Sequence, residues 1–348
     1  MFFSYFWRGC ERCYLSLIWL GGGVLPKIWV MRTVKSQFEA VSIKQSTIAL
    51  FCSLAISTLF LYTSEACSAE HVIQLKSEET GDDGFGNKLL AYKMVEHKVD
   101  GADITDHYSA EATIPGPTLF LTEGDVVKIS ILNAIPGNET AVPGISKQVS
   151  IHVHGVHYDI LSDGTLKVIN HNFDEGAGAG LEETYAVYNY KWNVAHGTAG
   201  TWAYHDHNYE SHNGSENKGL FGAIIVSPKN APKYDKEYVL YLGDDAFWGM
   251  EIDGNTHKQS KHGANPSLAA AKNSDVRFHL IAMGTDIHQF ALPGYHWTDP
   301  GTNRHISTAA IGPLEKHVFS VKAKFSSFYI DRDLSNRLLG MKGNFQVN

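Results

Sequence analysis

The stretch Trp202-Ala-Tyr-His-Asp-His-Asn-Tyr-Glu-Ser-His-Asn-Gly-Ser-Glu-Asn-Lys-Gly-Leu-Phe221 begins with strand character and places His205 and His207 two residues apart. Side chains at positions i and i+2 of a strand lie on one face, roughly 6.5 Å apart along it. Two imidazoles in this arrangement can close on one metal ion or reach two adjacent ions. One such pair is a weak signal, because a buried histidine is more often satisfied by ordinary hydrogen bonds.

A second pair with the same spacing lies upstream, in Ser150-Ile-His-Val-His-Gly-Val-His-Tyr158, where it consists of His152 and His154. Two His-x-His pairs on predicted strands form a candidate four-imidazole site. Imidazole ligands without thiolate suit copper, zinc, iron or nickel, and the order of intrinsic affinities favours copper. The two pairs together therefore predict a metal site.

The chain from Glu70 onward shows short apolar alternations broken by Gly, Pro, Asn and Asp. Val126–Leu132 alternates like a half-buried strand, and Gly222–Val226 is a compact β-branched run. Many short strands with regular turns favour a β-sandwich or barrel. Residues 268–272, rich in alanine, are an exception and predict one or two turns of helix. Further strand patterns occur at 238–242, 276–282, 317–322 and 327–330.

These patterns divide the chain of 348 residues. We expect a targeting segment at 1–69, a first domain at 70–228, a linker at 229–236 and a second domain at 237–348. The linker is placed where prolines and charged residues separate two runs of strands. Both the first domain and the second domain are predicted to be all-β.

The predicted targeting segment has the pattern of a secretory signal. Arg32, Lys35 and Lys44 precede an apolar run at 47–62, and small residues follow at 64–69. This order of basic flank, apolar centre and small-residue cleavage site is typical of exported proteins. We therefore expect a periplasmic or extracellular protein. Met31 is a candidate true start, and Cys67 is a weak candidate for lipid anchoring.

The composition limits the partners and the chemistry. The chain has 29 basic and 37 acidic residues, and the part after residue 69 carries a net charge of −11 because six of the basic and three of the acidic residues precede it. Such a surface repels phosphate backbones, so we expect no nucleic-acid partner. After residue 70 no apolar stretch is long enough to span a bilayer. Past residue 67 no thiolate is available, since the cysteines are Cys10, Cys13, Cys52 and Cys67.

The chain resembles the two-domain, laccase-like multicopper oxidases, particularly the small bacterial laccases. Residues 115–119 followed by 123–127 look like the opening strand pair of that family. Residues 152–164 are similar to its first copper motif, and 200–207 with 219–222 are similar to its second. The resemblance covers nearly all the mature chain, strongly in the first domain and weakly in the second. It implies two tandem cupredoxin-like Greek-key β-sandwich domains and a homotrimer.

The resemblance also implies roles for residues of the first domain. It assigns His152 to the type 2 copper, and His154, His205 and His207 to the type 3 pair. Tyr158 and Asp163 fall at positions where the family keeps groups that contact the ligands. Such groups fix the orientation of a ligand and tune the water bound to the metal.

The second domain departs from the family pattern at the trinuclear cluster. In its third motif, Ala291 and Pro293 stand at the positions of two cluster histidines. In its fourth motif, Ile330 and Arg332 replace two more. The trinuclear site of a homotrimer would therefore have half of its histidines, and the Arg332 guanidinium, which keeps its proton, would repel a copper ion.

The blue copper site is also incomplete in the second domain. Asp331 replaces the cysteine and Asn336 replaces the second histidine, while His288 and Met341 remain. A blue copper site requires one cysteine and two histidines, so this site is excluded. We expect a packed loop with a solvated Asp331 in its place, and the alternative is a carboxylate-containing metal site formed by His288, Asp331 and Asn336.

We therefore expect an exported copper-binding protein that holds about one non-blue copper per chain through His152, His154, His205 and His207. The family implies a copper-dependent oxidoreductase, but the chain's own ligand set is incomplete. One alternative is a laccase-like oxidoreductase that is completed in a hetero-oligomer with an intact multicopper oxidase. Others are an enzyme with a reduced, mononuclear copper site and an interaction module without metal.

Overall fold

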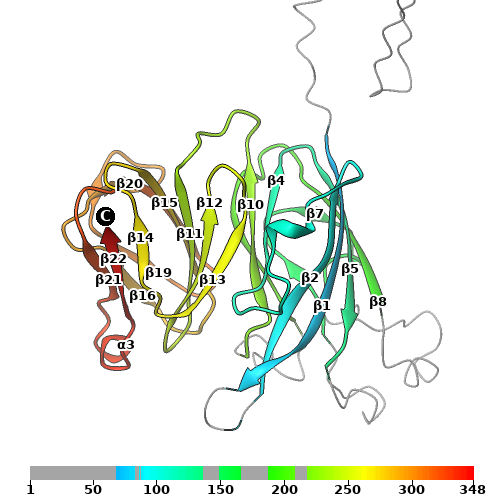
Figure 1. Ribbon diagram of the computed structural model, residues 1–348, viewed down its shortest axis with the longest axis horizontal. Helices are drawn as coiled ribbons and strands as arrows, with labels where there is room; N and C mark the ends of the chain where they lie inside the picture. The colour runs from blue at the N-terminus through cyan, green and yellow to red at the C-terminus, as the bar shows by residue number, and fades with distance from the viewer. Residues whose placement is uncertain (1–67, 83–85, 87, 136–148, 166–186, 208–217) are drawn as a thin grey trace, which may run out of the picture. The chain divides into compact units, whose positions relative to one another are not determined.

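The computed structural model describes residues 68–82, 86, 88–135, 149–165, 187–207 and 218–348 (Figure 1). Residues 66–348 form one compact unit. The predicted targeting segment at 1–69, with Met31 and Cys67, lies almost wholly outside the described residues, as does the glycine-rich stretch at 174–180.

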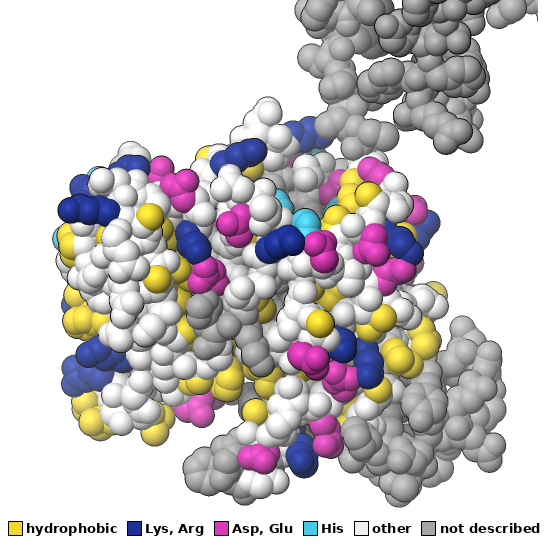
Figure 2. All heavy atoms as spheres, in the orientation of Figure 1, with side chains coloured by type: hydrophobic (Ala, Val, Ile, Leu, Met, Phe, Trp, Pro, Cys, Tyr) yellow, Lys and Arg dark blue, Asp and Glu magenta, His cyan; other side chains and the backbone are white. Residues whose placement is uncertain are grey.

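The described residues form strands almost throughout, which confirms the predicted all-β fold class. Their helices are a short 3₁₀ helix, η1 (Thr105–His107), and the five-residue α3 (Leu334–Leu338). None of the helices in this part of the chain has the length and apolar character needed to cross a membrane. On the face shown in Figure 2, acidic and basic side chains are interspersed among apolar and polar ones.

The first half of the described chain forms a sandwich of two sheets. One sheet has the order β3-β2-β1-β5-β8-β7 and the other has the order β4-β10-β9-β6. Leu75 and Val127 of the first sheet pack against Leu119 and Ile224 of the second in a common core. The strands are β1 (Glu70–Asp82), β2 (Lys88–Val99), β3 (Ala102–Asp103), β4 (Thr118–Thr122), β5 (Val126–Asn133), β6 (His152–Val153), β7 (His157–Tyr158), β8 (Val187–Asn193), β9 (Gly200–His205) and β10 (Phe221–Ser227).

The second half forms another sandwich, with an aromatic core. Its sheets have the orders β13-β12-β11-β15-β20 and β14-β22-β21-β16-β19, with β17 and β18 as a separate pair. Tyr238 and Phe278 of one sheet pack against Phe290 and Phe345 of the other. The strands are β11 (Lys236–Leu242), β12 (Phe247–Asp253), β13 (Gln259–Ala264), β14 (Leu268–Ala270), β15 (Asp275–Ala282), β16 (His288–Ala291), β17 (Trp297–Thr298), β18 (His305–Ile306), β19 (Thr308–Ile311), β20 (Lys316–Lys322), β21 (Ser327–Asp331) and β22 (Lys342–Val347).

A third apolar layer joins the two sandwiches. Phe221 and Ile225 of β10 face Val239 and Tyr241 of β11 in this layer, while the alternate residues of both strands face their own cores. Both strands are therefore buried on two faces, which explains why residues 221–226 and 238–242 are apolar runs without polar alternation. Fully burying a side chain such as Ile225 contributes about 1.5–3 kcal/mol.

The helix predicted at 268–272 is wrong, because residues 268–270 form β14. This strand pairs in parallel with β22, where Leu268 lies beside Phe345 and Ala270 beside Val347. Leu268 and Ala270 are buried and Ala269 is exposed, which is the period of a strand. Pairing with a strand about 75 residues later in the chain has overridden the helix propensity of the alanines.

A buried hydrogen-bonded chain crosses between the sandwiches. Thr201 Oγ1 on β9 lies 2.6 Å from His279 Nδ1 on β15, and His279 Nε2 lies 2.8 Å from Glu237 Oε2 on β11. Burial lowers the pKa of His279, so the ring is neutral and donates through Nε2 to the carboxylate. His279 Nδ1 then accepts from the Thr201 hydroxyl. The fully buried imidazole thus has partners on both sides of the junction.

We expect Thr201→Val to lower the free energy of unfolding by about 1–3 kcal/mol, because it leaves His279 Nδ1 buried without a donor. Chemical denaturation monitored by tryptophan fluorescence measures this change. Thr298→Val, at the exposed position of β17, is the matched control and should change the free energy by less than about 0.5 kcal/mol. Equal stability of the two variants would contradict the role of this contact.

Candidate metal centre

Strand pairing brings the two His-x-His pairs together. In the antiparallel register of β6 and β9, His152 lies directly opposite His205. The pairing continues beyond β6, where the backbone N–H of His154 donates to the carbonyl of Ala203. Because cross-strand partners lie about 5 Å apart, the imidazoles of the two pairs must meet on one face of the sheet.

The imidazoles of three histidines converge. His154 Nε2 and His205 Nε2 are 3.1 Å apart. One ring nitrogen from each of His152, His154 and His205 lies within 4.8 Å of the other two. Nitrogens bound at about 2.0 Å in a tetrahedral site are roughly 3.3 Å apart, so the pair at His154 and His205 already has the spacing of two ligands on one ion.

Two backbone carbonyls select the tautomers of these rings. His152 Nδ1 lies 2.6 Å from the carbonyl oxygen of Asp163, and His205 Nδ1 lies 2.9 Å from that of Asp206. A carbonyl can only accept, so Nδ1 carries a hydrogen in both rings, which leaves Nε2 as the nitrogen that would coordinate a metal ion. A hydrogen bond on the other ring nitrogen is the usual support of a metal-binding histidine.

The rings are also held in the neutral state. Burial lowers the pKa of His152. Burial, together with the neighbouring His205 and His152, lowers the pKa of His154 to about 3. A metal ion must displace any proton on its ligand, so neutral rings bind without that cost at neutral pH. The donor set therefore fits copper as well as the other metals that imidazole prefers.

His207 completes the group of four but is less closely engaged. Its ring centroid is 5.1 Å from that of His152 and 5.8 Å from that of His205. Its backbone N–H donates to Ser150 Oγ. Its ring is not one of the three whose nitrogens lie within 4.8 Å of one another.

The two other residues that the sequence singled out also lie near His152. The carboxylate of Asp163 is 3.5 Å from His152 Nδ1, and the carbonyl of the same residue is the hydrogen-bond acceptor described above. The Tyr158 ring centroid is 6.3 Å from that of His152, and this tyrosine is 38% exposed. Asp163 is therefore the residue that positions the His152 ring, while Tyr158 stands beside it at the surface.

The structure adds three residues that sequence reasoning missed. Trp202 packs against Gly155, where a Cβ atom would lie 1.9 Å from the indole and where φ is +76°. Lys316 of β20 lies over the ring of Trp202, with Nζ 3.2 Å from the ring centroid. The charge of Lys316 contributes to the low pKa of His154. No spacing could have revealed Lys316, because it comes from the second sandwich.

The four residues at the predicted vestigial blue copper position also come together. His288 Nδ1 lies 2.7 Å from Asp331 Oδ2, and Asn336 Nδ2 donates to the same oxygen at 2.9 Å. Met341 is linked through its backbone, with its N–H donating to the carbonyl of Asn336. All four side chains are at most 1% exposed.

The expectation that Asp331 is solvated is wrong. The residue is completely buried. Burial opposes its ionisation, but hydrogen bonds from His288, Asn336 and two backbone amides outweigh this, and its pKa falls to about 2. The sequence pattern could not show this, because the partners come from β16, the turn after β21 and α3. The carboxylate occupies His288 Nδ1 with a hydrogen bond, so this ring nitrogen is not free for a metal.

Comparison with known proteins finds a family model that is similar to part of the chain. Residues 92–231 match the multicopper oxidase family. Over 226 residues the chain is 30% identical to a probable nitrite reductase-hydroxylamine oxidoreductase fusion protein from Kuenenia stuttgartiensis, covering 61% of this chain and 24% of that protein. It is 26% identical over 196 residues to laccase-8 from Oryza sativa subsp. japonica, covering 51% of this chain and 30% of that protein. The chain thus spans less than a third of the length of either relative.

Solved structures show the same fold across both sandwiches. A crystal structure of a multicopper oxidase has a TM-score of 0.52 at 22% identity, covering 80% of this chain and 88% of that chain. Copper nitrite reductase from Nitrosomonas europaea has a TM-score of 0.51 at 16% identity, covering 80% of this chain and 94% of that chain. These likenesses show the fold, and the match at residues 92–231 shows the similarity of that segment to the multicopper oxidase family.

We expect Lys316→Met to tighten copper binding on the order of tenfold, because it removes a positive charge from beside His154. Competition with a chromophoric chelator measures the affinity. Lys324→Met, at an exposed position after β20, is the matched control and should leave the affinity unchanged. A weaker affinity in Lys316→Met would show that the lysine supports the site instead of opposing the cation.

Proposed function

We propose that this chain is an exported, non-blue copper-binding protein that holds about one copper ion through His152, His154 and His205, with His207 beside them. The supporting observation is the convergence of three imidazoles, two of which are oriented by hydrogen bonds from Nδ1 to backbone carbonyls. A copper ion bound there would act as a Lewis acid and would be able to change its oxidation state. The chain's own residues hold the rings neutral and oriented.

The second sandwich supports a non-blue protein. A blue site requires a thiolate, and the chain has none past Cys67. Where the family places that cysteine, we infer that Asp331 stands instead, hydrogen-bonded to His288 and Asn336. We also infer that Ala291, Pro293, Ile330 and Arg332 take the positions of the cluster histidines, so that the homo-oligomer lacks half of the trinuclear ligands.

We expect about one copper per purified chain, with no intense blue colour and no turnover of phenols. The double variant His154→Ala, His205→Ala should lose this copper, because it removes both nitrogens of the 3.1 Å pair. Elemental analysis after dialysis measures the copper, and copper electron paramagnetic resonance reports its ligands.

The matched control is the double variant His296→Ala, His305→Ala, which removes two exposed histidines that are distant in sequence from both pairs. It should retain the full copper content. Equal loss of copper in the two double variants would show binding by scattered imidazoles. Substantial oxidation of phenols by the pure homo-oligomer would overturn the proposed function outright.

The alternative function is a copper-dependent oxidoreductase completed by another chain. It rests on the same three histidines, which would form one half of a site facing an intact second domain. Phenol oxidation that arises only on mixing with a cysteine-containing multicopper oxidase, and that His154→Ala, His205→Ala abolishes, would favour this function over copper binding alone.

Export and the trimer are proposals that rest on the sequence. The apolar run at 47–62 and the small residues after it support cleavage near residue 66 or 69. Intact-mass measurement of protein recovered from the periplasm or medium tests cleavage, and sedimentation equilibrium tests the trimer. A full-length chain retained in the cytoplasm would contradict export.

A further inference from the structure

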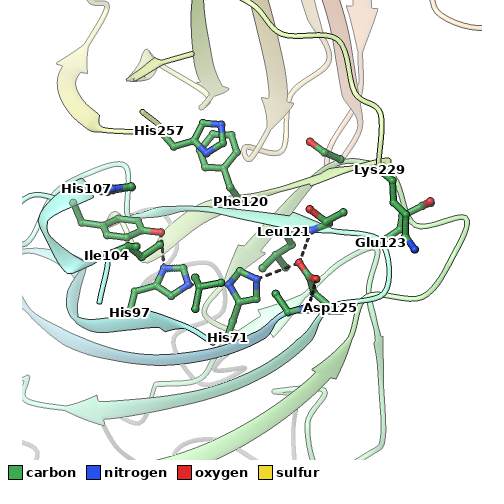
Figure 3. Close-up of a pocket in the computed structure, with 15 residues that line it drawn as sticks. His71, His97, Ile104, His107, Phe120, Leu121, Glu123, Asp125, Lys229 and His257 are labelled. Atoms are coloured by element: carbon green, nitrogen blue, oxygen red, sulfur yellow. Dashed lines mark hydrogen bonds and ion pairs between the residues drawn. The ribbon is translucent and has the colours of Figure 1, made fainter. Parts of the chain in front are cut away.

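A second cluster of histidines lines a cavity that the metal site does not use. The cavity has a volume of about 450 Å³, and His71, His97, His107, His257, Tyr108 and Phe120 are among the residues that line it (Figure 3). They come from β1, β2, η1, β4 and the turn between β12 and β13. A cavity of this size is within the range of small-molecule sites.

Four of the lining residues form one hydrogen-bonded chain, which we call the Asp125–Tyr108 chain. Asp125 Oδ2 lies 3.1 Å from His71 Nε2, His71 Nδ1 lies 2.9 Å from His97 Nε2, and His97 Nδ1 lies 2.7 Å from the Tyr108 hydroxyl. His71, His97 and Asp125 are at most 5% exposed. Figure 3 shows His71 and His97 side by side with Asp125 at one end.

Asp125 is fixed as a carboxylate at its end of the chain. Its Oδ1 accepts from the backbone N–H of Ala69, and its Oδ2 accepts from that of Thr122. Burial opposes ionisation, but these hydrogen bonds and the one from His71 outweigh it, and the pKa of Asp125 lies below its ordinary value. An ionised carboxylate can only accept. His71 Nε2 must therefore carry a hydrogen.

The direction of the other hydrogen bonds follows from the Tyr108 end. Burial raises the pKa of Tyr108, so its hydroxyl keeps its hydrogen, and His97 Nδ1 is the partner that this hydroxyl has among the described residues. Burial lowers the pKa of His97 to about 3, so this ring is neutral: its Nδ1 accepts from Tyr108, and its Nε2–H donates to His71 Nδ1. Tyr108 must then donate its hydroxyl hydrogen to His97. What remains on the Tyr108 oxygen is a lone pair, so the hydroxyl can only accept from a ligand.

The other walls of the cavity favour a flat, acidic molecule. Phe120 and His257 are stacked with centroids 4.2 Å apart and planes at 6°, and they lie across the cavity from His71 and His97 (Figure 3). Val99, Ile104 and Leu121 add apolar surface. Lys229 also lines the cavity, and it makes no ion pair with any described residue, whereas Glu123 is held by His196 and two backbone amides.

The cavity is separate from the candidate metal centre. His205 pairs with Phe221 at the start of β10, whereas Ser227 at the end of the same strand lines the cavity. A seven-residue strand spans roughly 20 Å. A ligand in the cavity therefore does not contact a metal at the three histidines, and this inference does not depend on copper binding.

We propose that this cavity binds a small aromatic carboxylate with a ring N–H, of the indole type. The N–H donates to the Tyr108 oxygen, the ring packs beside Phe120 and His257, and the carboxylate pairs with Lys229. A ring N–H can donate but not accept, which complements a hydroxyl whose own hydrogen is committed to His97.

Calorimetric titration of the full chain with indole-3-acetate and with 1-methylindole-3-acetate tests this site. The unmethylated probe should bind about tenfold more tightly, because methylation removes the one donor that Tyr108 can accept. Absence of binding, or equal affinity for the two probes, would overturn the proposal whatever the behaviour of any variant.

Three variants assign the selectivity to residues. In Tyr108→Phe the two probes should bind with equal affinity, at the level of the methylated one. Lys229→Met should weaken the binding of both probes by the same factor and keep the ratio of their affinities. Tyr234→Phe, which changes a tyrosine stacked under Arg277, is the matched control and should leave both affinities unchanged. If the ratio of the two affinities persisted in Tyr108→Phe, Tyr108 would be excluded as the hydrogen-bond acceptor.

The direction of the Asp125–Tyr108 chain has its own measurement. Long-range ¹H–¹⁵N spectra at neutral pH should show a hydrogen on Nε2 and none on Nδ1 in both His71 and His97. A hydrogen on Nδ1 of His97 would reverse the chain, turn the Tyr108 hydroxyl toward the cavity as a donor and contradict the selectivity proposed for N–H ligands.

Discussion

The pairing of β9 with strands on both of its sides is the constraint from which the rest of the structure follows. On one side it pairs with β10, which is buried on both faces and carries the apolar layer between the sandwiches. On its other side it pairs with β6 and sets His152 opposite His205. The same strand therefore carries the packing between the two sandwiches and the geometry of the metal site. Because its end is anchored by apolar burial, the imidazoles are held in place without a metal.

A buried aspartate performs a similar task in each sandwich. Asp206 accepts from the backbone N–H of Ser150, and Asp331 accepts from that of Gln289. Each carboxylate thus ties the end of one strand to a neighbouring segment. The difference lies in the nearby histidine. The Nδ1–H of His205 donates to the backbone carbonyl of Asp206, whereas Nδ1 of His288 is hydrogen-bonded to the carboxylate of Asp331.

The same contrast explains how one chain contains histidines with different chemistry. Rings that face a carbonyl, such as His152, keep a lone pair free for a ligand. Rings that end on a carboxylate, such as His71, His279 and His288, are used to polarise a hydrogen-bonded chain or to satisfy a buried acid. A count of histidines does not distinguish these cases. The group on the far side of each ring decides which nitrogen is available.

Much of the fold could be read from the sequence because it depends on local patterns. Alternation at 126–132 and the continuous apolar run at 222–226 predicted β5 and β10, and the i, i+2 spacing of His152 with His154 and of His205 with His207 put each pair on one face. Long-range pairing was not accessible in this way. It converted 268–270 from a predicted helix into β14, and it buried Asp331 among residues from three elements.

The sequence by itself determined strands such as β5 and β10, the paired imidazoles and the lack of a thiolate after residue 67, because each is a matter of residue type and of spacing within a few positions. Only the tertiary structure decided which nitrogens face one another, that Lys316 stands beside the metal site, and that His71, His97 and Tyr108 form a chain ending at Asp125. Those groups are 11 to 54 residues apart. Their protonation and contacts depend on burial and on partners that meet only when the sheets pack.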